Sequence, residues 1–251
     1  MSDKPTSLQQ VNKEIIRCRK CPRLVEYRER VAREKRLAYR DCTYWGKPVP
    51  GFGDPQAQLL IVGLAPGAHG SNRTGRMFTG DRSGIFLYQA LYDAGFANQP
   101  TAVSPDDGLQ LKNVYIAAAA RCAPPDNKPL PSEILNCRTY LEREIDILQP
   151  KAVLALGKIA WDVFLGVLKH RVVIPARVGY RFAHGAEVEL PQSGTHLFGV
   201  YHPSQQNTQT GLLTPAMYAT VLRRVQRFLQ QNANTEGTGK KSTRTQPRAG
   251  L

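Results

Sequence analysis

The residues whose types are best suited to chemistry are concentrated in one loop, which spans residues 65–81. The loop holds four glycines, two arginines, a histidine, an asparagine and an aspartate, with Phe78 among them. It follows the short apolar run 59–64, which is typical of a buried strand in a parallel sheet. Ligands of open α/β sheets bind where loops leave the carboxyl ends of strands, and glycines let a ligand approach the backbone closely. We therefore predict a ligand site here; the alternative is a long flexible connection.

The thiols form a second set of reactive side chains. Cys18 and Cys21 make a C-x-x-C pair, and Cys122 and Cys137 make a distant second pair. Four thiolates in a tetrahedral arrangement suit either zinc or an iron–sulfur cluster, and the spacing alone does not separate the two. Cys42 lies outside this pattern and is expected to be a small buried apolar residue.

Alternating strands and helices must position both sets of residues. Further apolar runs predict strands at 114–120, 152–156 and 196–200. The alternation indicates an α/β fold in which helices cover both faces of a parallel sheet. An alternating segment, 172–190, is predicted to form a hairpin. Helices are predicted before Cys18, from Ile85 to Gly95, from Pro131 to Leu148, through Ala160 to Leu168, and from Thr214 and Pro215 to Phe228.

Composition and charge favour an intracellular protein with a polyanionic partner. The 251 residues include 41% apolar residues, enough for one domain with a sizeable core, and carry a net charge of +14. Simple solubility is the plainer explanation of the charge. We expect no membrane span and no signal segment, and an intracellular location argues against disulfides. One domain is predicted over residues 1–231, followed by a disordered basic tail over 232–251.

Three long sequence blocks resemble one known family. They are GLAPGAHGSNRTGRMFTGD in the loop, RCAPPDNKP at 121–129, and YHPSQQNTQTG at 201–211. With the four cysteines, they are similar to family 5, the type-b enzymes, of the uracil-DNA glycosylase superfamily. The resemblance runs from Cys18 to Phe228. It implies a three-layer α/β/α sandwich with a central four-stranded parallel sheet. We also expect a monomer that is cytoplasmic and associated with the nucleoid. The resemblance also implies a [4Fe-4S] cluster on Cys18, Cys21, Cys122 and Cys137.

The same resemblance assigns roles in removing uracil and other deaminated bases from DNA. Phe78 would stack on the extruded base. Asp81 would stabilise positive charge on the sugar or orient water, and His202 would donate a hydrogen bond to the base oxygen. Asn127 would hold the water or a base edge. The plainer roles are a core ring for Phe78, a helix N-cap for Asp81 and a turn residue for Asn127.

Two positions suggest how this chain differs from other families of the superfamily. Where those families carry a polar residue that acts on water, this chain has Leu64, so Asp81 is the best available carboxylate. Where uracil-restricted members carry an asparagine that reads the base, this chain has Ala118. An alanine does not penalise other bases, so we predict that hypoxanthine is removed as well. The main chain at Gly63 and Ala65 is expected to border the base.

Contacts with the DNA itself are expected from basic and loop residues. Arg73, Arg76 and Lys128 would contact phosphates, and Arg73 and Arg76 would also position the loop 65–81 itself. Ser204 and Gln205 belong to a loop that would enter the minor groove. Leu212 or Leu213 would be the wedge that fills the gap left by the extruded base.

Two other classes of function compete with this interpretation. A non-enzymatic DNA-binding protein that senses redox state through its cluster would have the same charge and cysteines. A nucleotide-binding enzyme is weakly supported, because the chain lacks the usual phosphate-binding glycine motifs in the right place.

Overall fold

A mixed six-stranded sheet forms the centre of the protein in the computed structural model, which describes residues 7–171, 173–175, 179–191 and 194–239. The strand order is β1-β3-β2-β4-β6-β5, and the middle four strands are parallel. These four are almost wholly buried apolar runs, as expected for strands covered on both faces. The strands are β1 (Phe52–Gly53), β2 (Leu59–Gly63), β3 (Val114–Ala118), β4 (Ala152–Leu156), β5 (Glu187–Glu189) and β6 (His196–Val200).

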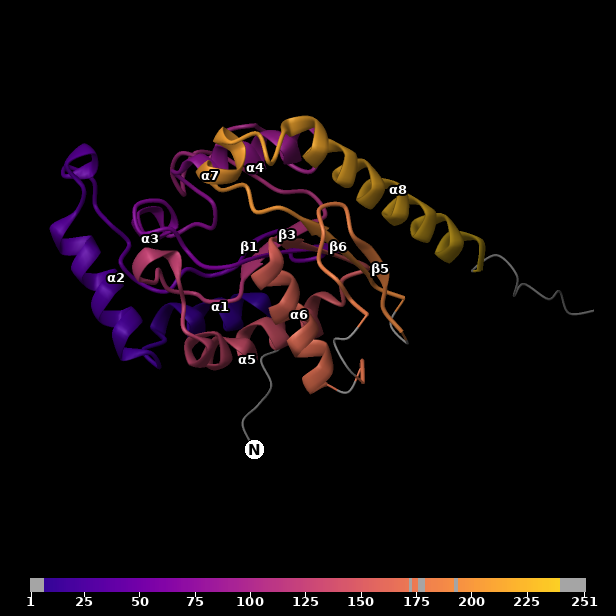
Figure 1. The fold of residues 1–251 in the computed structure, drawn as a ribbon, viewed down its shortest axis with the longest axis horizontal. Coiled ribbons are helices and arrows are strands. Elements are labelled where there is room, and N and C mark those ends of the chain that lie inside the picture. Colours follow the sequence, from indigo (N-terminus) through magenta and orange to yellow (C-terminus); the bar gives the residue numbers. More distant parts are fainter. Residues whose placement is uncertain (1–6, 172, 176–178, 192–193, 240–251) are drawn as a thin grey trace, which may run out of the picture.

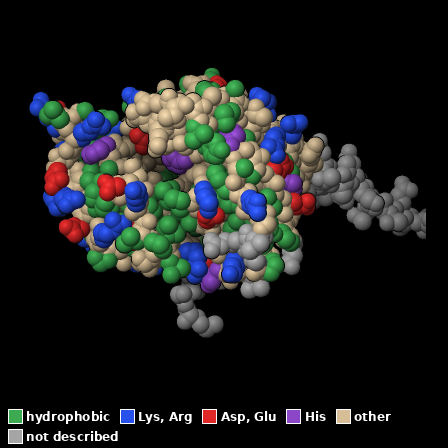
Figure 2. All heavy atoms as spheres, viewed as in Figure 1, with side chains coloured by type: hydrophobic (Ala, Val, Ile, Leu, Met, Phe, Trp, Pro, Cys, Tyr) green, Lys and Arg blue, Asp and Glu red, His purple; other side chains and the backbone are tan. Residues whose placement is uncertain are grey.

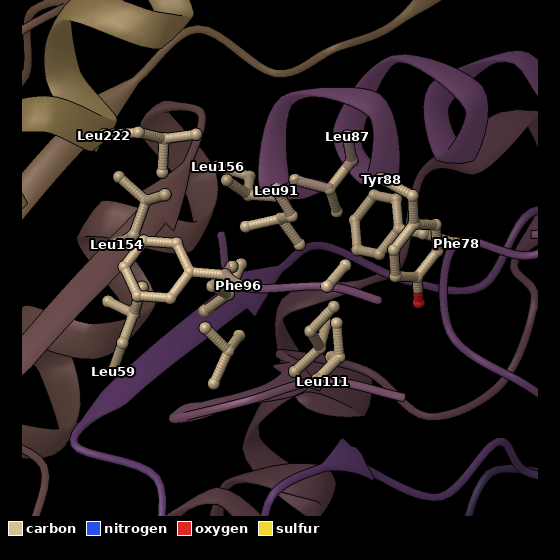
Figure 3. Packing of buried hydrophobic residues seen from close by; sticks show 14 of the residues in the cluster. Leu59, Phe78, Leu87, Tyr88, Leu91, Phe96, Leu111, Leu154, Leu156 and Leu222 are labelled. Atoms are coloured by element: carbon tan, nitrogen blue, oxygen red, sulfur yellow. The ribbon is translucent and has the colours of Figure 1, made fainter. Parts of the chain in front are cut away.

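Helices cover both faces of this sheet (Figure 1). Alternate residues of each strand point to opposite faces. On one face, Leu59 and Ile61 of β2 pack with α4 and α8, and Figure 3 shows part of this cluster. On the other face, Leu60 and Val62 pack with α5 and α6. The helices are α1 (Leu8–Arg17), α2 (Pro22–Glu34), α3 (Ser71–Thr74), α4 (Arg82–Asp93), α5 (Pro131–Leu148), α6 (Lys158–His170), α7 (Gln205–Gln209) and α8 (Pro215–Gly239), with the 3₁₀ turns η1 (Leu37–Tyr39) and η2 (Pro125–Asn127).

The predicted three-layer α/β/α fold with four central parallel strands is confirmed. The sheet also has two short antiparallel edge strands, β1 and β5. The predicted hairpin over 172–190 is wrong, because the described residues of this segment do not contain two strands that pair with each other. The only strand described there, β5, pairs with β6, whose free edge offers a ready partner.

The C-terminal helix is longer than predicted. α8 begins at Pro215 as expected but continues past Asn232 to Gly239, so this part of the predicted disordered tail is helical. Residues 240–251 lie outside the described residues. Within the described part of the chain, no helix is both long enough and apolar enough to cross a membrane.

Candidate active site

The carboxyl ends of β2 and β3 form the floor of the candidate site. Gly63 and Ala118 are paired across these two strands, and the pairing continues because Ala119 N donates to Gly63 O at 2.9 Å. Ala118 is buried in the core cluster that also contains Phe78. Its methyl group therefore lies on the sheet face where the loop 65–81 folds over. Ala65 is half-buried in the first part of that loop.

Phe78 lies between the core and the site. Its side chain is 9% exposed and belongs to the edge of the large apolar cluster (Figure 3). Its backbone has φ of 53°, which is strained for a bulky residue, and Phe78 N donates to Ser71 Oγ at 3.0 Å. Such strain persists where the surroundings enforce it, often at functional sites. A methyl group at Gly63 would lie 2.9 Å from Phe78 Cζ, so glycine leaves room for this ring. Ser71, which the sequence did not single out, positions Phe78.

Asp81 caps α4 and also faces the loop. Its Oδ1 accepts a hydrogen bond from Gly84 N at 2.9 Å, which is the predicted N-cap role. Burial raises the pKa of Asp81 above its ordinary value, and the backbone amides and Arg73 oppose that rise. The other oxygen, Oδ2, lies against the backbone of Gly70. One carboxylate oxygen therefore holds the helix end, and the other is directed toward the glycine-rich loop.

A methyl group at Gly70 should displace this carboxylate. An added Cβ would overlap Oδ2, Cγ and Cβ of Asp81, and the backbone of Gly70, with φ of −99° and ψ of −102°, also lies outside the regions that alanine favours. Because misplacing a reacting group by about 1 Å can cost roughly 10²-fold, we expect Gly70→Ala to slow base release ten- to a hundredfold in single-turnover assays. Gly166→Ala, in open space within α6, is the matched control. Equal rates for the two variants would contradict the assigned position of Asp81.

His202 follows β6 and lies beside Phe78. The two ring centroids are 6.1 Å apart with an interplanar angle of 37°, so both rings border the same space. Burial lowers the pKa of His202 to about 4, and the imidazole is therefore neutral at physiological pH. Its backbone oxygen accepts a hydrogen bond from Asn207 Nδ2 at 2.9 Å, and Gly157 leaves room for its Cβ. A neutral ring can still donate one N–H to a base oxygen.

The structure places Asn127 and Lys128 on an exposed loop after β3. Asn127 adopts φ of 55°, which is consistent with the plainer role of a turn residue. Lys128 is exposed, and its carbonyl accepts a hydrogen bond from Arg23, which also pairs with Glu133 of α5. Among the described residues, no hydrogen bond or ring contact joins this loop to Phe78, Asp81 or His202. Its predicted roles remain predictions.

The two arginines of the loop have internal partners. Arg76 is buried, and its guanidinium forms a bidentate ion pair with Asp107 at 2.7 and 2.8 Å. The predicted phosphate contact of Arg76 is therefore wrong, because reaching a phosphate would break a buried ion pair. Arg73 donates to the carbonyl oxygens of His69 at 2.8 Å and Gly80 at 3.0 Å. Arg73 therefore joins two parts of the loop, and its predicted phosphate contact stays a prediction.

The segment after β6 presents one of its two leucines to solvent. Leu212 is 50% exposed, whereas Leu213 is 1% exposed and belongs to the core cluster. Only Leu212 can therefore act as a wedge. Ser204 caps α7 by accepting a hydrogen bond from Asn207 N, and Gln205 is exposed on the same short helix.

The four paired cysteines come together away from this site. They line one small cavity between α2, the loop after β3, and α5. In the part of the chain that the structure describes, no three histidine, cysteine or carboxylate side chains converge closely enough to hold a single metal ion. Cys42 is half-buried and lies outside the cavity. The four cysteines that line the cavity are Cys18, Cys21, Cys122 and Cys137.

A buried cation lies beside these thiols. Arg28 is 2% exposed and donates to Cys122 Sγ at 2.8 Å, and its Nε has no partner among the described residues. Burial raises the pKa of the Cys122 thiol to about 12 and that of Cys137 to about 11, so both are neutral as free thiols. Arg28 Nη2 also lies 3.7 Å from Oε1 of Glu29. An anionic group bound by these sulfurs would add a second counter-charge beside the buried guanidinium, so the residues fit such a group.

Comparisons with known proteins agree with this geometry. Residues 50–226 match the sequence model of the uracil DNA glycosylase superfamily. The type-5 uracil-DNA glycosylase of Mycobacterium leprae is 49% identical over 219 residues, which cover 86% of this chain and 93% of that protein. The type-5 protein of Thermus thermophilus is 50% identical over 212 residues, covering 84% and 93%. The type-4 protein of Archaeoglobus fulgidus is 27% identical over 199 residues, covering 79% and 82%. This chain therefore belongs to the uracil-DNA glycosylase superfamily, and within it to the type-5 family.

Proposed function

We propose that this enzyme hydrolyses the N-glycosidic bond of uracil in DNA, and also that of other deaminated bases, hypoxanthine among them. The observation that carries the proposal is the position of Phe78 beside His202 at the carboxyl ends of the sheet, in one cluster with Ala118, while Asp81 faces the glycine-rich loop that carries Phe78. Base and sugar must both reach these groups, so the nucleotide is extruded from the duplex.

Each of these side chains acts on a different part of the extruded nucleotide. The ring of Phe78 offers a stacking surface for the base, and neutral His202 donates to a base oxygen as negative charge develops there. Asp81, in its ionised form, stabilises the positive charge that develops on the sugar or orients the attacking water. Leu64 has no group that could activate water, so Asp81 is the carboxylate on which the proposal depends.

The breadth of substrate rests on Ala118. Its small side chain lies paired with Gly63, and it has no polar atom to be left unpaired by a base of the wrong kind. A buried polar reader would discriminate strongly, because an unmatched polar group costs about 1–3 kcal/mol. The larger ring of a purine also needs the volume that an alanine leaves. Uracil and hypoxanthine are therefore both accepted.

Replacing Ala118 tests this proposal. Ala118→Asn is expected to keep uracil release within about tenfold of wild type and to reduce hypoxanthine release by about 10²-fold, the discrimination that one unpaired polar group can supply. Single-turnover assays on matched duplexes measure both rates. Ala118→Leu is the matched control, because it adds similar volume without polar atoms and should slow both substrates. Wild-type protein that releases uracil but leaves hypoxanthine untouched, even in enzyme excess, would contradict the proposal. A protein that only sensed redox state would release neither base.

We further propose that the four cysteines hold a [4Fe-4S] cluster. The four thiols line one small cavity, as the ligands of a single bound group would, and the resemblance to the type-b enzymes favours a cluster over zinc. The buried charge of Arg28 supports an anionic group. When bound, the cluster would supply a structural cross-link, since it would tie the segment between α1 and α2 to α5 and to the loop that carries Asn127.

A further inference from the structure

A basic turn projects from the protein beside the loop 65–81. It comprises residues 35–40, KRLAYR, which connect the end of α2 to η1 and which we call the η1 projection. Leu37 is 79% exposed, the most exposed large apolar side chain among the described residues. Arg36 and Arg40 are also exposed. Among the described residues, the carboxylate that pairs with Arg40 is that of Asp41, which is itself almost fully exposed. The turn therefore presents an apolar tip flanked by cations.

The η1 projection is fastened to the catalytic loop. The ring of Tyr39 lies under the guanidinium of Arg73, 4.2 Å from ring centroid to guanidinium carbon. Arg73 in turn holds the carbonyl of Gly80, next to Asp81. The turn is closed by Lys35 Nζ, which donates to the carbonyl of Arg40 at 3.0 Å. A segment held in this way is a fixed part of the site's border.

The residues that follow the projection add further attachments. Tyr44 Oη and His69 Nδ1 are 3.0 Å apart. Trp45 N donates to Arg73 O at 2.8 Å, and Gly46 N donates to Asn72 O at 3.0 Å. Burial, followed by the charges of Arg36 and Arg73, lowers the pKa of His69.

The projection and the Leu212 segment lie on opposite sides of the site. In Figure 1 η1 is the indigo turn at the upper left, above α2, while α7 lies at the top centre, with α3 below and between them. Figure 2 shows Lys and Arg side chains around hydrophobic atoms at this corner, and a hollow between the corner and the top of the molecule. DNA that places a base in the hollow would therefore have flanking nucleotides near both elements.

We propose that the η1 projection is a second DNA-binding element, which holds the duplex on the side of the extruded base opposite Leu212. Arg36 and Arg40 contact phosphates, and Leu37 packs against the sugars or the groove wall between them. Cations beside an exposed apolar side chain are the combination with which proteins grip a DNA backbone and groove. The choice of DNA as the partner of the η1 projection rests on the proposed function. It also accounts for an exposed leucine at a position fixed to the catalytic loop.

The salt dependence of binding to undamaged duplex tests the proposal without requiring catalysis. For Arg36→Ala/Arg40→Ala, the slope of log affinity against log salt should become shallower by about 1 to 2, because each lost phosphate contact removes about 0.9. Affinity near physiological salt should fall roughly tenfold. Lys13→Ala/Lys169→Ala is the matched control, since it removes two exposed charges from α1 and α6 and should leave the slope near the wild-type value. Fluorescence anisotropy of a labelled duplex measures both.

The outcomes decide between DNA and other partners for the projection. A slope equal to that of wild type, or a change equal to the control's, would overturn the proposal and would leave the turn as a surface for another protein. Leu37→Ala should weaken duplex binding without changing the slope of log affinity against log salt. Unaltered affinity would show that Leu37 does not contact the DNA. Failure of wild-type protein to release uracil would refute the proposed function alone, since these binding measurements do not depend on it.

Discussion

Replacing Asp81 or His202 should slow base release by about 10²- to 10³-fold, the usual effect of removing one group that stabilises charge in a transition state. The two side chains come from different elements, Asp81 from the start of α4 and His202 from the segment after β6, where it lies beside Phe78. Because both act on charge that develops only as the bond breaks, affinity for undamaged DNA should change little. Single-turnover rates on a uracil duplex, with enzyme in excess, measure the chemical step. Unaltered rates in both variants would show that the site lies elsewhere.

The choice of substitution separates the two roles of Asp81. Asp81→Ala also removes the N-cap bond to Gly84 N, which should cost about 1 kcal/mol of unfolding free energy. Asparagine caps a helix as well as aspartate does but carries no charge. Asp81→Asn should therefore fold with nearly wild-type stability and yet release uracil as slowly as Asp81→Ala. Asp93→Ala, at the other end of α4, is the control for the loss of an exposed carboxylate. An Asp81→Asn enzyme with wild-type rates would reduce Asp81 to a helix cap.

The acid side of the pH–rate profile should follow the same carboxylate. Burial raises the pKa of Asp81, and the ionised form is the active one, so the rate should fall as pH drops through a value above that of an ordinary aspartate. His202 should add no inflection to the pH–rate profile near pH 6.5, because its pKa of about 4 keeps it neutral there.

The lowered pKa of His202 also affects stability. The unfolded chain binds more protons than the folded chain between about pH 4 and 6.5, so the free energy of unfolding should decline as pH falls through that window.

Much of the fold follows directly from local patterns in the sequence. The runs at 152–156 and 196–200 form β4 and β6 with the predicted bounds, because strands buried on both faces must be continuously apolar. Gly63 and Phe78 could likewise be assigned to one site, since loops that leave parallel strands share one edge of the sheet. The four cysteines line one cavity, as their pairing in the sequence suggested.

The errors arose where a distant partner decides what a side chain does. Arg76 looks available for a phosphate until Asp107, far along the chain, is seen to pair with it. Similarly, Leu212 and Leu213 are adjacent apolar residues, and only the packing of α8 shows which of them is buried. The segment 187–189 is a different case, because it pairs antiparallel with β6, the next strand along the chain, and not with an earlier part of 172–190. The burial of Arg76 and of Leu213 leaves no signal within a few residues.

Replacing Cys122 with serine should remove both the visible colour of the purified protein and part of its stability. Cys122 follows β3, whereas Cys18 and Cys21 lie between α1 and α2, so a cluster on these sulfurs joins segments far apart in the sequence. Because the free energy of binding such a group is also folding free energy, losing one ligand should lower the unfolding free energy by several kcal/mol. Arg28 would then lie buried beside a hydroxyl in place of a thiolate, which adds to the loss.

Cys42→Ser provides the matched control for this variant, since Cys42 is half-buried and lies outside the cavity. It should keep the broad visible absorbance of an iron–sulfur protein, stoichiometric iron and sulfide, and a wild-type melting temperature. Iron and zinc analysis of the wild-type protein distinguishes the two groups that four thiolates can hold. A colourless wild-type protein with stoichiometric zinc would overturn the cluster while leaving the cross-link between these segments intact. Equal stability of the Cys122→Ser and Cys42→Ser proteins would refute the structural role for either group, because the segments would then be held by protein contacts such as the packing of α1 on α5 and the Arg23–Glu133 ion pair.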